Sequence, residues 1–242
     1  MSNKIKRFYS RVETAPVKSG FTVELDGRPI RSPGQQVMHL PQQKMADELA
    51  REWHQQEEFI DPAVMPVMQF ASMVNDNIIP DPENARTEIL KYANSDLLCY
   101  RVGEPQALVE RQKKLWDPVL QRFESEYGID FLTSTGILYV EQRREAMDRF
   151  WSLIKPLERY ELGAVHLVTV MSGSAVLAIA LQKNWMSAEM VWELAHLDED
   201  FQAEQWGRDE EAVERRQRRY VEFSAAILCL GSNSGHSDSA NS

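Results

Sequence analysis

The chain has 242 residues, of which 43% are hydrophobic and 26% are charged. This is the balance of a folded globular protein, so disorder of the whole chain is excluded, and the length allows one large domain or two modest ones. The formal net charge of −10 arises from 37 acids and 27 bases. A general nucleic-acid binder is excluded as well, because it needs a basic surface to displace counterions from phosphate.

The two cysteines and the first residues of the chain indicate the cellular compartment in which the protein is expected. Cys99 and Cys229 lie far apart, each within an apolar run. Disulfide frameworks and zinc sites need more ligands at closer spacing, so we expect buried free thiols in a reducing compartment. The first 20 residues contain no apolar core of a secretory signal.

The segment from Leu162 to Leu181 has no acid or base over 20 residues, which is long enough to span a bilayer. However, His166 and the run Ser172-Gly173-Ser174 interrupt it. We therefore predict two short buried helices that meet at the small residues, and no membrane insertion.

Residues 1–104 are predicted to form a small mixed α/β domain with an antiparallel sheet. The expected strands are 8–12, 21–25 and 37–40, with a tight turn at Asp26-Gly27. A strand over 97–102 is expected to return to this sheet. Residues 1–33 carry seven bases and three acids, which fits either a solvated arm or an arm that docks on an acidic partner.

Helical periodicity begins after Pro41 and dominates the rest of the chain. Helices are predicted around Met45–Trp53, Val67–Val74, 83–93, 108–127, 147–154, 187–207 and 213–227. Gly128 is expected to end the longest of them, and Ser187 to cap the start of another. Residues 105–230 are thus predicted to form a helical bundle and residues 231–242 a disordered tail.

Motifs for cofactor chemistry are absent. The glycine patterns that bind ATP or NAD do not occur, so no cofactor is predicted. His196 and Asp200 share a helix face at i, i+4, which could supply two ligands to a metal. A surface charge pair is the commoner explanation, but a metal-assisted hydrolase stays open as an alternative, as does a general helical adaptor protein.

An acidic helical hairpin near the C-terminus is the most unusual segment. It places three consecutive acids beside large aromatic side chains between His196 and Asp209: Asp198, Glu199 and Asp200 with Phe201 and Trp206. Adjacent acids repel one another on a helix. Either the aromatics fill the core and the acids are solvated, or the hairpin recognises a basic partner. Trp53, among polar residues at a helix end, poses the same choice between core packing and an interfacial anchor.

Sequence motifs spread along the chain resemble one known family. They are Lys6-Arg7-Phe8-Tyr9, 21–29, Ala50-Arg51-Glu52-Trp53, Ile60-Asp61-Pro62, Met65-Pro66, 92–101, Gln112, Trp116-Asp117-Pro118, Gly136-Ile137 and 197–207. In this order they resemble the assembly chaperones of the soluble catalytic head of F-type ATP synthase, in the branch that handles the alpha subunit.

The resemblance implies an α+β protein, with the mixed N-terminal domain followed by an orthogonal α-helical bundle. It implies that the chain binds unassembled alpha subunit, prevents its aggregation and hydrolyses no nucleotide. Trp53, Asp198 and Glu199 match sensitive positions of the family. Ser32 replaces the usual threonine, and Asn75-Asp76-Asn77 replaces an Ala-Ile-Asp-like run.

We interpret the hairpin as a partner-binding element. Leu197, Phe201 and Trp206 are predicted to pack it into the bundle, while Asp198 and Glu199 face the partner, and Trp53, Asp200 and Trp206 complete the predicted set of partner-binding residues. Eukaryotic relatives act in the mitochondrial matrix and carry transit peptides. None is visible here, which favours a bacterial cytoplasm.

Overall fold

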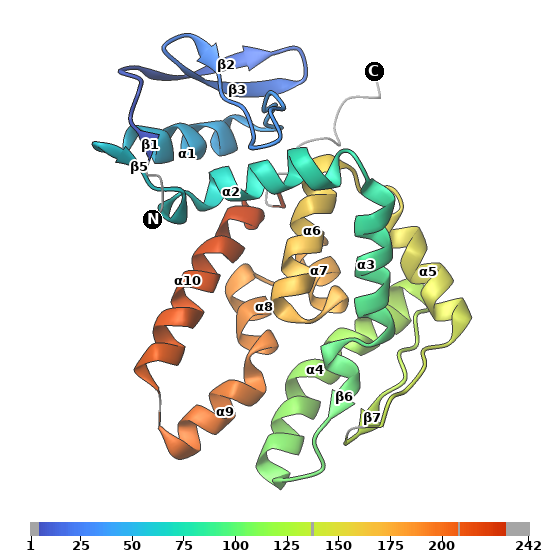
Figure 1. Ribbon diagram of the computed structural model, residues 1–242. Coiled ribbons are helices and arrows are strands. Elements are labelled where there is room, and N and C mark those ends of the chain that lie inside the picture. The colour runs from blue at the N-terminus through green and yellow to red at the C-terminus, as the bar shows by residue number, and fades with distance from the viewer. Residues whose placement is uncertain (1–4, 137, 208, 231–242) are drawn as a thin grey trace, which may run out of the picture.

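The computed structural model describes residues 5–136, 138–207 and 209–230; the predicted tail 231–242 lies outside this range. The strands of the first 60 residues and the helix α1 (Gln43–His54) gather at one end, and the remaining helices form the larger body below them (Figure 1). The fold is mixed α+β, with small sheets first and helices afterwards, which confirms the predicted class.

A three-stranded antiparallel sheet forms the N-terminal end. Its strands are β2 (Val12–Val17), β3 (Gly20–Leu25) and β4 (Arg28–Pro29), in the order β2-β3-β4. Asp26 and Gly27 both adopt positive φ between β3 and β4, the tight turn that their sequence predicts. One face of the sheet packs on α1 (Gln43–His54), which lies beneath it in Figure 1.

The strand predicted over 8–12 is wrong in its position. Residues 5 and 6 form β1, which pairs antiparallel with β5 (Phe59–Ile60), and β2 begins only at Val12. Between them the amides of Ser10 and Arg11 donate to the Asp26 carboxylate, at 3.2 and 2.9 Å. A side chain thus takes the place of a neighbouring strand, which spacing alone does not reveal.

Two further strand predictions fail. Residues 37–40 make only isolated bridges, at Val37 and Leu40. The segment predicted to return to the sheet forms a 3-10 turn, η3 (Leu97–Cys99), and then β6 (Tyr100–Arg101), which pairs parallel with β7 (Ser134–Thr135) instead. The Asp96 carboxylate accepts the amide of Leu98 at 3.0 Å, which closes the turn.

The helical body contains most of the chain. Its helical segments are η1 (Pro62–Val64), α2 (Pro66–Met73), the π-helical η2 (Val74–Ile78), α3 (Pro82–Asn94), α4 (Gln106–Tyr127), α5 (Arg144–Ile154), α6 (Arg159–Ser172), α7 (Ala175–Gln182), α8 (Ala188–Ala195), α9 (Leu197–Trp206) and α10 (Glu210–Ile227). Gly128 ends α4 in the left-handed conformation, and the Ser187 side chain caps α8, as predicted.

One continuous core joins the two ends of the molecule. α3 packs against α5 and α6, and α10 packs against α2 and α6, so α2 and α3 lie within the helical body of Figure 1. The division of the chain after residue 104 stays a prediction. Both cysteines are free thiols, and burial raises the pKa of Cys229 to about 12.

The apolar run 162–181 folds as two buried helices, α6 and α7, which meet at Gly173 in a left-handed conformation. Buried Asp96 fixes this break, because its carboxylate accepts the Ser174 hydroxyl at 2.7 Å and the Val176 amide at 3.0 Å. Among the described residues no helix is long and apolar enough to cross a membrane.

The helix predicted over 187–207 is two helices. His196 leaves helical geometry, with φ −112° and ψ 18°, so the chain turns between α8 and α9. Leu194, Leu197 and Phe201 are buried as predicted, but Met190, in the first turn of α8, is 44% exposed.

Candidate partner-binding groove

A groove of about 910 Å³ opens between α8, α9 and α10. In Figure 1, α8 and α10 rise from the two ends of α9. The lining includes, along each helix and its flanking residue, a stripe of residues at i, i+3, i+4 and i+7. The stripes are Glu189, Trp192, Glu193 and His196; Glu199, Gln202, Ala203 and Trp206; and Asp209, Ala212, Val213 and Arg216.

Aromatic side chains from α8 and α10 lie together at the groove. The Trp192 ring lies 4.1 Å from the ring of His196, 5.3 Å from that of Tyr220 and 5.1 Å from that of Phe223, measured between centroids. Trp192 and His196 are buried, and Tyr220 is half-buried. This aromatic cluster packs α8 against α10.

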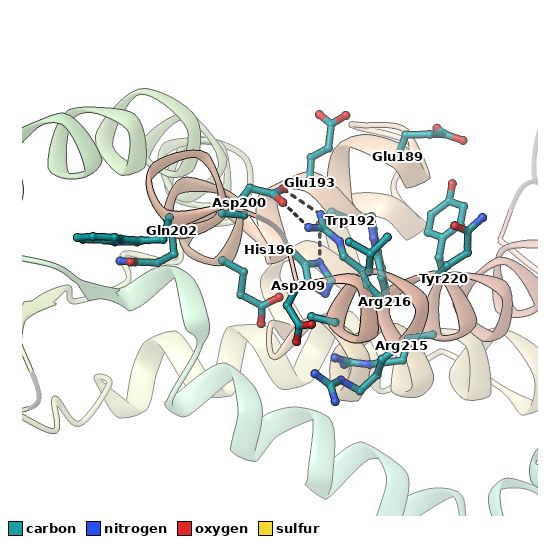
Figure 2. A pocket seen from close by; sticks show the side chains of 18 residues that line it. Glu189, Trp192, Glu193, His196, Asp200, Gln202, Asp209, Arg215, Arg216 and Tyr220 are labelled. Carbon is teal, nitrogen blue, oxygen red and sulfur yellow. Dashed lines mark hydrogen bonds and ion pairs between the residues drawn. The ribbon is translucent and has the colours of Figure 1, made fainter.

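An ion pair joins two walls of the groove. Both carboxylate oxygens of Asp200 on α9 accept hydrogen bonds from the guanidinium of Arg216 on α10 (Figure 2). The two side chains are each less than one-third exposed, and the hydrogen bond to Asp200 raises the pKa of Arg216. The planar guanidinium and the carboxylate match in geometry, so the pair holds the hairpin at a defined opening.

On its other side α9 is fixed to α4. Gln112 donates from Nε2 to Asp198 at 2.8 Å, and Arg111 donates two hydrogen bonds of 2.8 Å to the Glu204 carboxylate. The Arg111 guanidinium also lies 5.2 Å from the ring centre of Phe201. The acids of α9 therefore divide between two neighbours, which offsets the repulsion that their sequence order predicts.

Two of the predicted residues are left at the surface. Glu199 is exposed at the groove, and Trp206 is 85% exposed at the last turn of α9. The prediction that Trp206 packs the hairpin into the bundle is wrong, whereas Leu197 and Phe201 are buried as predicted. Trp206 is five positions after Phe201 on α9, so helical geometry places it about 140° around the helix from Phe201, away from the buried side.

Trp53 lies elsewhere. It is 8% exposed, its ring contacts that of Tyr9 at 5.5 Å, and its carbonyl accepts the Tyr9 hydroxyl at 2.5 Å. Of the two alternatives for Trp53, core packing and an interfacial anchor, the structure therefore shows core packing. A direct contact between Trp53 and a partner stays a prediction.

The proposed metal pair has other partners. His196 Nδ1 lies 2.8 Å from the carbonyl oxygen of Trp192, and Asp200 pairs with Arg216. Burial lowers the pKa of His196, and the nearby charges of Arg216 and Arg219 act in the same direction. Within residues 5–136, 138–207 and 209–230, no three His, Cys, Asp or Glu side chains come together as a metal site.

Sequence reasoning missed most of the groove. Trp192, Val213, Arg216 and Tyr220 line it, but none was in the predicted site. The helical spacing of the α8 and α9 stripes was present in the sequence. The single helix that the sequence predicts over 187–207 would place the two stripes on different faces, so the spacing does not reveal a common groove.

Comparison with known proteins assigns the chain to a class. Among solved structures, a putative chaperone from Agrobacterium tumefaciens superposes with a TM-score of 0.88 at 43% identity, over 94% of this chain and 85% of that one. Atp12 from Paracoccus denitrificans gives 0.85 at 30% identity, over 93% of this chain and 97% of that one. The fold is thus that of a chaperone, which acts by binding a protein and not by catalysis.

The family follows from the same comparisons. A family model described as ATP12 chaperone protein matches residues 6–124. Protein atp12, mitochondrial, of Schizosaccharomyces pombe is 22% identical over 221 residues, which cover 86% of this chain and 76% of that protein. The chain belongs to the ATP12 chaperone family, the assembly factors for the alpha subunit of F1-ATPase. The resemblance to that family and the expected absence of enzymatic activity are confirmed.

Proposed function

We propose that this chain binds the unassembled alpha subunit of F-type ATP synthase at the groove of α8, α9 and α10 and prevents its aggregation until incorporation. One observation carries the choice of surface. Trp206 is 85% exposed beside the exposed acid Glu199, on a helix that ion pairs hold from two sides.

The energetics of binding favour this surface. A tryptophan that is buried on association supplies a large apolar area, and tryptophan is enriched among residues that dominate interface energy. Because α4 and α10 already hold α9 in place, little conformational freedom is lost when a partner binds. Glu199 adds complementarity to a basic partner, which speeds encounter more than it strengthens the complex.

The five predicted partner-binding residues take different parts in this proposal. Glu199 and Trp206 touch the partner directly. Asp198 and Asp200 position α9 through Gln112 and Arg216. Trp53 packs in the N-terminal core, and only 8% of its surface is exposed to solvent.

We place this activity in a bacterial cytoplasm. The two solved relatives with 43% and 30% identity come from bacteria, whereas the mitochondrial relative is 22% identical. The sequence is therefore more similar to these bacterial proteins than to the mitochondrial one, which supports a bacterial location.

The test is suppression of aggregation. Purified alpha subunit is diluted from denaturant, and light scattering is followed with and without the chain at stoichiometric excess. We expect the chain to reduce scattering and to co-purify with the alpha subunit, and Trp206→Ala to weaken both effects. Unchanged scattering with the wild-type chain would overturn the proposal. Equal protection by wild type and Trp206→Ala would overturn the choice of surface.

A further inference from the structure

The groove between α8, α9 and α10 has the form of a helix bundle that lacks one helix. Three helices turn stripes with helical spacing toward one space of about 910 Å³, and within the described residues no element fills it. Val213 is 42% exposed there. We propose that one α-helix of the alpha subunit occupies the groove, with its basic side toward Glu193 and Glu199. This inference rests on the proposed function.

A helix fits these walls better than a strand does. The walls are helices, whose backbone groups are bonded internally, so they offer side chains and few backbone partners. An extended segment would bury its own amides and carbonyls without partners, at a cost for each group. A helix carries its backbone hydrogen bonds with it and can present an apolar stripe to the groove.

The size of the groove is consistent with a short helical segment. A helix rises 1.5 Å per residue and is about 10–12 Å wide with its side chains, so about 910 Å³ holds roughly two turns. Ala203 on α9 and Ala212 on α10 line the groove with small side chains. They allow the axis of an added helix to approach closely, while Trp206 covers its outer side.

The charges of the walls define the orientation of that helix. Among the described lining residues, α8 and α9 contribute four acids, while α10 contributes three arginines and the residue before it contributes one acid. They are Glu189, Glu193, Glu199 and Asp200 on one wall and Arg215, Arg216, Arg219 and Asp209 on the other. Figure 2 shows Glu189 and Glu193 on one side of the groove and Arg215 on the other.

Some of these charges are already paired within the chain. Asp200 binds Arg216, and Arg219 donates to the carbonyl of Met171 at 2.9 Å. Glu193 and Glu199 are exposed, and their charges remain at the acidic wall. Charge complementarity therefore selects a helix with lysine or arginine on the side next to α8 and α9.

A matched pair of substitutions tests whether the groove is filled. Gln202 lines the groove, and Gln205, on the same helix, does not; both are exposed. We expect Gln202→Trp to weaken binding of recombinant alpha subunit at least tenfold, because its indole takes the space of the incoming helix. Gln205→Trp should bind within about twofold of wild type. Circular dichroism and unfolding curves report that both variants fold.

Photocrosslinking identifies the occupant. p-Benzoylphenylalanine is placed at Gln202 and, separately, at Val213 of the full chain, and cross-linked peptides of alpha subunit are identified by mass spectrometry. We expect both positions to label one helical segment with lysine or arginine on one side. Labelling of strands or loops would overturn the inference.

The outcomes separate this inference from the proposed function. If the alpha subunit binds and is protected but neither groove position cross-links to it, the inference is wrong and the chaperone function stands. If the wild-type chain does not bind alpha subunit, the proposed function fails first and the inference fails with it.

Discussion

Ser32 donates a hydrogen bond from its hydroxyl to the carboxylate of Asp76, which joins the loop after β4 to the π-helical turn η2. The Gly34 amide donates to the same carboxylate at 2.9 Å. Ser32 is 2% exposed. The Asp76 carboxylate thus forms a contact between the N-terminal end and the helical body.

We expect Asp76→Ala to lower the free energy of unfolding by about 1–2 kcal/mol, because it leaves the buried Ser32 hydroxyl without its acceptor. Urea unfolding followed by fluorescence measures the change. Asn77→Ala is the control, since Asn77 is exposed in the same turn, and it should stay within about 0.5 kcal/mol of wild type. Equal stability of the two variants would show that the contact stabilises nothing.

Glu52 makes stability depend on pH. Burial raises the pKa of its carboxyl to about 7, although the amides of Val67 and Met68 donate to it at 2.7 and 2.9 Å and oppose that rise. The folded chain therefore holds a proton at Glu52 at pH values where the unfolded chain has lost it. The free energy of unfolding should fall as the pH rises from 4.5 toward 7.

Glu52→Gln removes this titration. We expect the stability of the variant relative to wild type to improve as the pH rises through that window, whatever its offset at low pH. Asp96, whose pKa burial raises to about 6, contributes in the same direction and is present in both proteins. Exposed Glu124→Gln serves as the control. A constant difference between wild type and Glu52→Gln across the window would contradict the prediction.

Substitutions of the adjacent acids Asp198 and Glu199 should have different effects. Asp198→Ala breaks the bond from Gln112 and should lower the free energy of unfolding by about 1 kcal/mol. Exposed Glu199→Lys should leave stability within about 0.5 kcal/mol but slow association with alpha subunit. Chemical unfolding and stopped-flow binding measure the two effects.

Glu124→Lys on α4 is the matched charge reversal away from the groove, and it should leave the association rate unchanged. The slowing by Glu199→Lys should diminish in high salt, because salt screens exposed charges. A loss of affinity that is independent of salt would argue for a different role of Glu199.

The two tryptophans of the predicted site should behave in opposite ways. Trp53→Ala empties a buried position and should cost about 3–5 kcal/mol of stability. Trp206→Ala removes an exposed ring and should change stability by less than about 0.5 kcal/mol, while it weakens binding of alpha subunit about tenfold or more. Thermal melts and calorimetric titration distinguish them. A large loss of stability in Trp206→Ala would show that its ring packs on the body.

Local sequence signals predicted most elements of the fold. Gly128 ends α4, Gly173 separates α6 from α7 and Ser187 caps α8 because each fixes a backbone conformation or a hydrogen bond within a few residues. The strand errors near Ser10 and Leu98 arose where Asp26 and Asp96 accept backbone amides. Such side-chain acceptors leave no mark in hydrophobic periodicity.

The candidate site could be predicted only in part, because long-range pairs shape it. Arg111 and Glu204 are 93 positions apart, and Gln112 and Asp198 are 86 apart. These contacts determine which acids of α9 remain exposed. The spacing within α9 separates Trp206 from the buried Leu197 and Phe201, whereas hydrophobic periodicity does not mark the turn at His196 where α9 begins.

The pair of Asp200 and Arg216 should control the opening of the groove. Its side chains are 29% and 30% exposed, so water screens them only in part. A double-mutant cycle with Asp200→Ala and Arg216→Ala should give a coupling energy of about 1–2 kcal/mol. Hydrogen exchange should show faster exchange of α9 amides in either single variant, since one of the two contacts that hold the helix is lost.

The control is a second pair on α10. Arg215 lies 3.8 Å from Glu211, and both side chains are well exposed. Arg215→Ala with Glu211→Ala should therefore give a coupling close to zero. Equal coupling in the two cycles would show that Asp200 and Arg216 form no more than a surface pair, and that α4 alone holds α9 in place.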